Sequence, residues 1–207
     1  TVKKVIKDGA IGKIFRLESR FERFREAINP GSWRENQDAS EGGGILLDLQ
    51  PHLLSTALDW FGPAELVSSS INSIRGGVDD DSVLVLKHAS GVDSYLSGSA
   101  IVGSPGPRIR LIGDKGALII SDLDPQEAIL RSGVYPKGGV WEQSTKSKAF
   151  IHRGDEVTEY ESVNGNYAQF YTQVKEALSG GIWPVTTDEA LSVAKIIDLA
   201  RQNSIRK

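Results

Sequence analysis

Residues 108–120 read Arg-Ile-Arg-Leu-Ile-Gly-Asp-Lys-Gly-Ala-Leu-Ile-Ile, two apolar runs joined by Gly113-Asp-Lys-Gly116. Short apolar runs on either side of a glycine-containing turn predict a β-hairpin. Further runs on both sides of this hairpin are separated by turn residues in the same way. Together they predict strands at 65–74, 81–89, 93–101, 107–113, 116–121, 127–131 and 156–162. Residues 132–148, with Gly133, Pro136, Gly138 and Gly139, predict a long loop.

Helices are expected at both ends of this series of strands. Val2, Val5 and Ile6 form the apolar stripe of a short helix that Gly9 would end. Apolar and polar residues then alternate over 14–24, which predicts a strand. Two helices are predicted near the C-terminus, the first with the stripe Tyr167, Phe170, Tyr171, Val174 and Leu178 and the second after the capping sequence Thr186-Thr-Asp-Glu189. Consecutive strands flanked by helices predict an α+β fold with one large, mostly antiparallel open sheet and helices packed on one face. Because the sequence has no internal repeat and no clear linker, we expect one domain over residues 1–207.

Composition narrows the class of protein. The hydrophobic share of 39% and the charged share of 25% are those of a globular chain, which excludes disorder as the main state. No apolar run approaches the ~20 residues of a membrane span. A net charge of −3 does not indicate a basic surface that would bind nucleic acid or anionic lipid. Cysteine is absent, and the first residues lack the apolar core of a signal peptide. We therefore expect a cytoplasmic protein with no membrane or nucleic-acid partner.

Asp48 and His52 are the candidate catalytic pair. They are four residues apart at the start of a stretch in which Leu53, Leu54, Ala57, Leu58 and Phe61 have helical spacing. On a helix, a carboxylate one turn from an imidazole can fix its tautomer and make it a proton acceptor or donor. The alternative is an ordinary solvated helix face. We expect no metal, because a third ligand is lacking: the other histidines, His88 and His152, have no ligand spacing.

Three other segments have both a functional and a structural interpretation. Trp33 and Arg34 could stack on a ligand and bind an anion, or belong to a surface loop (25–41) pinned by a buried tryptophan. The run Gly42–Gly44 lacks the spacing of a phosphate-binding loop and is expected to let a helix begin close to another backbone. Pro51 is expected in a first helical turn or at a kink after a short first helical segment. Asp79-Asp-Asp81 is expected to be a solvated turn.

The whole chain resembles the second domain of one enzyme family. The order Gly-Gly-Gly-Ile-Leu-Leu-Asp-Leu-Gln-Pro-His (42–52) resembles the G-G-G-x-L-x-D-x-G-x-H signature of the Gfo/Idh/MocA family of NAD(P)-dependent sugar and inositol oxidoreductases. Residues 8–14 resemble its domain junction, 113–120 its sheet hairpin and 166–201 its closing helix pair. The segments around Glu18–Arg25 and Trp33–Glu35 look closest to the scyllo-inositol dehydrogenase-like branch.

The resemblance implies a function and a set of site residues. Family members carry an N-terminal Rossmann domain, which would hold most of the NAD or NADP site and a catalytic lysine, followed by a domain like this one, similar to the C-terminal domain of glyceraldehyde-3-phosphate dehydrogenase. The resemblance therefore implies that the Rossmann domain is absent from this chain, which would be inactive in isolation. It implies a polyol or sugar substrate and a homo-dimer or tetramer formed through the open sheet face. The implied site comprises catalytic Asp48 and His52, substrate-binding Arg23, Trp33, Arg34, Asp48 and His52, and cofactor-binding Trp33 and Arg34.

Two departures from the family pattern and two alternatives remain. Gln50 replaces the usual glycine, which could narrow the pocket, and Ser55 stands where aspartate is common. One alternative is a non-catalytic sensor or transcriptional co-repressor on the same fold. The other is a pure dimerisation module, which would leave the polar face of residues 48–59 unexplained.

Overall fold

The computed structural model describes residues 1–122, 124–135 and 147–205. The helices are α1 (Val2–Lys7), α2 (Trp33–Asn36), α3 (Ile45–Asp48), α4 (Gln50–Phe61), α5 (Gln126–Arg131), α7 (Tyr167–Leu178) and α8 (Thr187–Ile205), with a 3₁₀ turn, η1, at Ala39–Glu41. The strands are β1 (Ile14–Glu22), β2 (Ala64–Asn72), β3 (Asp81–His88), β4 (Asp93–Ser99), β5 (Ile109–Gly113), β6 (Gly116–Ile120), β7 (Ala149–Arg153) and β8 (Glu156–Tyr160).

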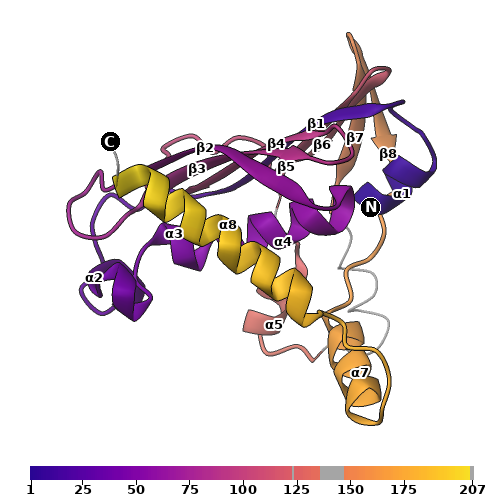
Figure 1. Cartoon of the computed structure of the whole chain (residues 1–207). Coiled ribbons are helices and arrows are strands. Elements are labelled where there is room, and N and C mark those ends of the chain that lie inside the picture. The colour runs from indigo at the N-terminus through magenta and orange to yellow at the C-terminus, as the bar shows by residue number, and fades with distance from the viewer. Residues whose placement is uncertain (123, 136–146, 206–207) are drawn as a thin grey trace.

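The strands form one sheet in the order β2-β3-β4-β1-β5-β6-β7-β8. β1 runs parallel to β4, and every other neighbouring pair is antiparallel. Figure 1 shows α4 and α8 lying on the same side of this sheet. The predicted α+β fold with a mostly antiparallel open sheet is therefore confirmed. Within the described residues, no helix has both the length and the apolar composition needed to cross a membrane.

The core lies between the sheet and these helices. Alternate strand residues turn toward the helices and are fully buried, among them Leu17, Leu96, Leu111 and Leu118. Helix α4 meets them with the stripe that its spacing predicts, since Leu53, Leu54 and Ala57 are also buried. Helix α8 begins at the expected capping box, where the Glu189 amide donates to the Thr186 hydroxyl, and it buries Ile196, Ile197 and Ala200.

The chain also differs from several expectations. Residues 127–131 form a helix instead of a strand, because Asp124 accepts a hydrogen bond from the Gln126 amide and Glu127 pairs with Arg131 one turn later. The strand β7 was not expected, although Ala149 and Ile151 alternate toward the core. The loop at 25–41 contains the short helix α2 and η1. Residues 136–146 of the long loop expected at 132–148 lie outside the described residues.

Helix α7 stands apart from this core. Figure 1 shows it projecting away from the sheet beyond the start of α8. Its predicted apolar stripe is exposed, with Tyr171 and Leu178 at 72% and 74%, and only Ala177 of this helix is buried. The helix therefore presents an apolar surface that nothing in the described chain covers.

Candidate active site

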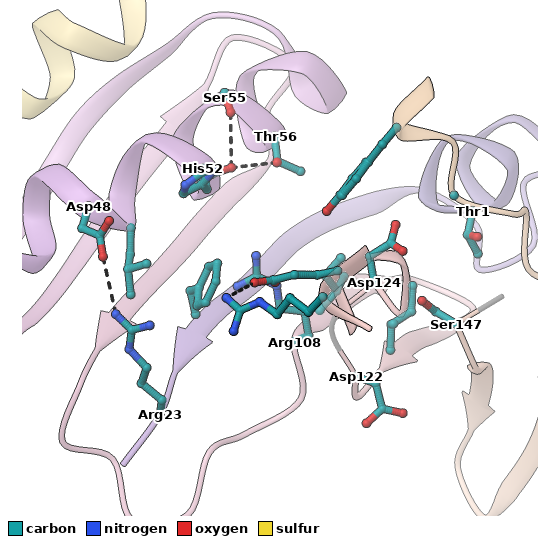
Figure 2. Close-up of a pocket in the computed structure, with 18 of the residues that line it drawn as sticks. Thr1, Arg23, Asp48, His52, Ser55, Thr56, Arg108, Asp122, Asp124 and Ser147 are labelled. Carbon is teal, nitrogen blue, oxygen red and sulfur yellow. Dashed lines mark hydrogen bonds and ion pairs between the residues drawn. The ribbon is translucent and has the colours of Figure 1, made fainter. Parts of the chain in front are cut away.

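A cavity of about 890 Å³ lies where the end of β1, the start of α4 and the start of β5 meet. Its wall includes four of the five predicted site residues, which are Arg23, Arg34, Asp48 and His52. Figure 2 shows Asp48, His52 and Arg23 on one side of this space and Asp122 and Asp124 on the other. Segments that are far apart in the sequence thus contribute to a single site.

The glycine run Gly42–Gly44 positions Asp48, because it lets the chain at the start of α3 pass close to other backbone segments. The Ile45 amide donates to the Asp79 carbonyl oxygen, and the Leu46 amide donates to the Asp79 carboxylate at 2.6 Å. A Cβ atom on Gly43 would lie 1.8 Å from the Gln37 carbonyl oxygen, and Gly44 has a φ of +98°. The expected close approach is confirmed. The Asp79–Asp81 segment is not the solvated turn that we expected, because Asp79 holds the start of α3.

Asp48 is paired with arginines and not with His52. The Arg34 Nε donates to Asp48 Oδ1 at 2.8 Å, and the Arg23 Nη2 donates to Oδ2 at 3.4 Å. Helix α3 ends at Asp48, and α4 begins at Gln50 with Pro51 in its first turn, so the kink that Pro51 suggested is present. Across the described residues no hydrogen bond or ion pair joins Asp48 to His52. The break at Leu49 explains this, because the two residues are not on one continuous helix.

His52 presents its imidazole to the cavity. Its side chain is exposed and lies against Phe21, with ring centroids 6.1 Å apart. Its carbonyl oxygen accepts hydrogen bonds from the hydroxyls of Thr56 at 2.8 Å and Ser55 at 3.3 Å, as drawn in Figure 2. Ser55 therefore supports the helix backbone next to His52.

Trp33 lies at the edge of the site. Its side chain is 47% exposed, and the Arg34 guanidinium lies 4.4 Å from its ring centroid. The interpretation of loop 25–41 as pinned by a buried tryptophan is therefore wrong. The stacked pair instead orients Arg34 toward Asp48, and part of the Trp33 side chain stays exposed.

A buried ion-pair network holds the Trp33–Arg34 segment in place. Arg75 donates to Asp80 at 2.9 Å and to Glu35 at 3.2 Å, and its side chain is 7% exposed. It also donates to the carbonyl oxygens of Arg25 and Ala27. Burial by itself would raise the pKa of the Asp80 carboxyl, but hydrogen bonds from two backbone amides and Arg75 outweigh it, so this pKa is lowered.

Gln50 does not narrow the cavity. Its side chain is fully buried and points toward the sheet, where Nε2 donates to the carbonyl oxygens of Ser82 at 3.1 Å and Leu96 at 3.2 Å. His88 is also structural, since its ring nitrogens contact the Gly62 carbonyl oxygen and the Ser94 hydroxyl. No group of three or more potential metal ligands is arranged as a metal site within the described residues.

Arg108 and the acidic residues of the wall opposite His52 were not predicted from the sequence. Arg108 immediately precedes β5, and its guanidinium lies 4.2 Å from the Phe21 ring centroid. Burial lowers the pKa of Arg108 to about 10. Asp122, Asp124 and Glu127 follow β6 and complete the wall. A signal existed for Arg108, a cation at the start of an apolar hairpin, but its contact with Phe21 depends on the pairing of β1 with β5.

Comparison with known proteins identifies the family of the chain. Residues 1–119 match the model of the GFO/IDH/MocA C-terminal domain. The chain belongs to the GFO/IDH/MocA family. It is 30% identical over its full length to the scyllo-inositol 2-dehydrogenase (NADP(+)) IolW of Bacillus subtilis, covering 59% of that protein. It is 29% identical to the uncharacterized Escherichia coli oxidoreductase YdgJ, with 99% of this chain and 60% of that protein covered.

Solved structures agree with this assignment. A Klebsiella pneumoniae protein assigned as an oxidoreductase superimposes with a TM-score of 0.86 and 30% identity, over 99% of this chain and 57% of that one. The chain thus spans about three fifths of the length of the relatives it matches. It is an oxidoreductase-family domain, and the activity of a whole protein remains a matter for proposal.

Proposed function

We propose that this domain is the substrate-binding and oligomerisation half of an oxidoreductase that transfers hydride between NAD(P) and a secondary alcohol of a sugar, inositol or related polyol. The observation that carries the proposal is the cavity whose wall brings Asp48, His52, Arg23 and Arg34 together. The family membership supports it, as does the relative whose name specifies NADP(+) and scyllo-inositol. The sensor alternative has no comparable support, because the curated relatives named above are a dehydrogenase and an oxidoreductase.

His52 is proposed as the acid/base group. Oxidation of an alcohol requires removal of its hydroxyl proton, and an imidazole is suited to accept that proton near neutral pH. The ring of His52 is exposed on the cavity side and is flanked by Phe21. In the reverse direction, the same ring would return the proton to the carbonyl oxygen.

Asp48 is proposed to orient the substrate. Its two oxygens already accept hydrogen bonds from Arg34 and Arg23, and its side chain keeps 20% of its surface exposed. Each carboxylate oxygen can accept more than one hydrogen bond, so both remain able to bind substrate hydroxyls. The arginines fix the carboxylate in place, which favours a positioning role over direct contact with the imidazole.

The residues at the rim fit a nicotinamide cofactor as a secondary contact. The exposed face of Trp33 can stack on a planar ring, and Arg34 can donate to an anionic group. The sequence has no G-x-G-x-x-G fingerprint, so most of the NAD(P) site would lie in an N-terminal Rossmann domain. NAD(P), when bound, supplies the hydride acceptor or donor. The exposed apolar stripe of α7 supports the packing of such a second domain on this side of the molecule.

The open sheet face is proposed as the oligomer interface. Alternation along the strands places Tyr95, Glu18, Arg110, Ile119 and Phe150 in one row across this face, each opposite the next. The row mixes apolar side chains with the Glu18–Arg110 ion pair, whose two atoms are 2.9 Å apart. A second copy of the same face could bury the apolar members and pair with the charged ones.

The test uses the full-length protein with a panel of inositols and sugars, and it follows NAD(P)H absorbance. We expect His52→Ala to lower kcat by roughly 10²–10⁴-fold with a smaller effect on KM. Asp48→Asn should also lower the rate, and the double variant should lose far less than the product of the two effects. His152→Ala, on the open face of β7, is the matched control. Near-normal turnover by His52→Ala with unchanged pH dependence would contradict the assignment.

A further inference from the structure

Among the described residues, Arg108 differs from the other arginines of the cavity wall in having no carboxylate partner. Among its contacts in the described chain, Nη1 donates to the Arg20 carbonyl oxygen and the guanidinium stacks on Phe21. The remaining arginines of this wall each pair with an acid, in the pairs Arg23–Asp48, Arg34–Asp48, Arg25–Glu35 and Arg131–Glu127. Most of the N–H donors of Arg108 therefore have no acceptor within the part of the chain that the structure describes.

The part of the wall that surrounds His52 has an excess of positive charge. Arg23, Arg34 and Arg108 contribute three guanidinium groups against the single carboxylate of Asp48. In addition, the Nε of Arg23 is buried without a hydrogen-bond partner in the described chain. Buried donors and charges are costly to leave unpaired, and burial already lowers the pKa of Arg108 to about 10. This wall is therefore complementary to an anion.

The carboxylates of the opposite wall are not paired with Arg108 in the described chain. Asp124 keeps its negative charge while it accepts hydrogen bonds from the amide and side chain of Gln126, and Glu127 is paired with Arg131. Figure 2 shows Asp122 at the far end of the cavity from Asp48 and His52. The ring of Phe21 meanwhile touches both His52 and Arg108, so the acid/base group and the uncommitted cation share one side.

We propose that Arg108 binds an anionic substituent of the substrate, a carboxylate or a phosphate carried by the polyol whose alcohol reacts at His52. The inference rests on the proposed function, since it takes the cavity to be the substrate site. It makes Arg108 a specificity-determining residue and makes the substrate an acidic polyol, such as a sugar acid or a sugar phosphate. The planar fork of the guanidinium suits either group, because it can donate two parallel hydrogen bonds.

The experiment compares acidic and neutral polyols on the full-length protein. Gluconate and 6-phosphogluconate are the acidic probes, and sorbitol and scyllo-inositol are the neutral ones. Calorimetry gives Kd for each probe, and NAD(P)H absorbance gives KM and kcat. Arg108→Met removes the charge, while Arg108→Lys keeps it without the fork. Arg153→Met is the matched control, since Arg153 is exposed, lies outside the cavity wall and donates to the Ala10 carbonyl oxygen.

We expect the wild-type protein to bind at least one acidic probe more tightly than the neutral ones. Arg108→Met should weaken that binding by about tenfold or more, as expected for the loss of a charge-assisted hydrogen-bond pair, and should change the neutral probes by less than about twofold. Arg108→Lys should recover part of the loss, and Arg153→Met should have no effect. Melting temperatures report on folding, and if Arg108→Met does not fold, the selective loss in Arg108→Lys decides.

Three results would overturn the inference. They are a preference of the wild type for neutral probes, an equal loss on acidic and neutral probes, and a selective loss of NADPH affinity, measured by nucleotide fluorescence. The last would assign Arg108 to a cofactor phosphate instead of the substrate. Failure of the proposed function looks different: no probe would be oxidised or reduced, while calorimetry would still show acid binding that depends on Arg108.

Discussion

Replacing the buried Arg75 by methionine should destabilise the protein far more than the same replacement of the exposed Arg131. Arg75 is 7% exposed, and its partners Asp80 and Glu35 are 3% and 10% exposed. Arg75→Met leaves the Asp80 carboxylate buried without its cation, leaves Glu35 with Arg25 alone, and removes donors from two carbonyl oxygens. Breaking a buried pair in this way costs about 3–5 kcal/mol of the free energy of unfolding.

Arg131→Met is the matched control. It removes the same group from an ion pair with Glu127 whose side chains are 79% and 49% exposed. Exposed pairs of this kind contribute at most about 1 kcal/mol. Urea unfolding followed by circular dichroism measures both variants, and similar losses in the two would refute the reasoning from burial.

The pH dependence of the free energy of unfolding gives a second check on the Arg75–Asp80 ion pair. Hydrogen bonds with backbone amides and Arg75 lower the pKa of Asp80 in the folded protein, so this carboxylate stabilises the fold above its unfolded pKa of about 3.9. That contribution is lost as the pH falls through the lower folded value. In Arg75→Met the unpaired carboxylate should favour its protonated form. The difference in stability between wild type and variant should therefore be largest near pH 7 and shrink in acid; a constant difference would argue against a role for the charge.

Two further predictions concern binding and assembly. The 207-residue chain should bind NADPH weakly or not at all, because its sequence lacks the glycine-rich turn that holds a pyrophosphate; micromolar affinity in a fluorescence titration would contradict this. The chain should form a dimer or larger homo-oligomer in sedimentation, and Tyr95→Asp on the open sheet face should weaken it while Tyr171→Asp on α7 should not. A wild-type monomer at tens of micromolar would count against the proposed interface.

The sequence was informative wherever a local pattern has one common structural solution. The hairpin at 113–116, the α4 stripe and the capping box at Thr186 each depend on neighbouring residues, and each was predicted correctly. The error at 127–131 shows the limit of such patterns. A short apolar run is compatible with a strand or a helix, and the deciding interactions there are a cap and an i,i+4 pair.

The candidate site was harder to predict because its contacts join segments that are far apart in the sequence. Asp48 and His52 stood out in the sequence, but their relation depends on the break at Leu49 and on Arg34, which α2 brings to Asp48. That position of α2 depends in turn on Arg75 and Asp80, between β2 and β3. Spacing along the chain could not show these links, because each joins segments that come together only when the sheet forms.

Arg108 shows how such a contact changes the chemistry that can be inferred. In the sequence it is one basic residue before a hairpin, with no motif around it. In the fold, the pairing of β1 with β5 sets its guanidinium on Phe21, next to the ring of His52 and without a carboxylate partner in the described chain. In the proposed function His52 acts on the reacting alcohol, and we propose that Arg108 binds an anionic group elsewhere on the substrate. The role proposed for this charge predicts that the cavity binds acidic polyols in preference to neutral ones.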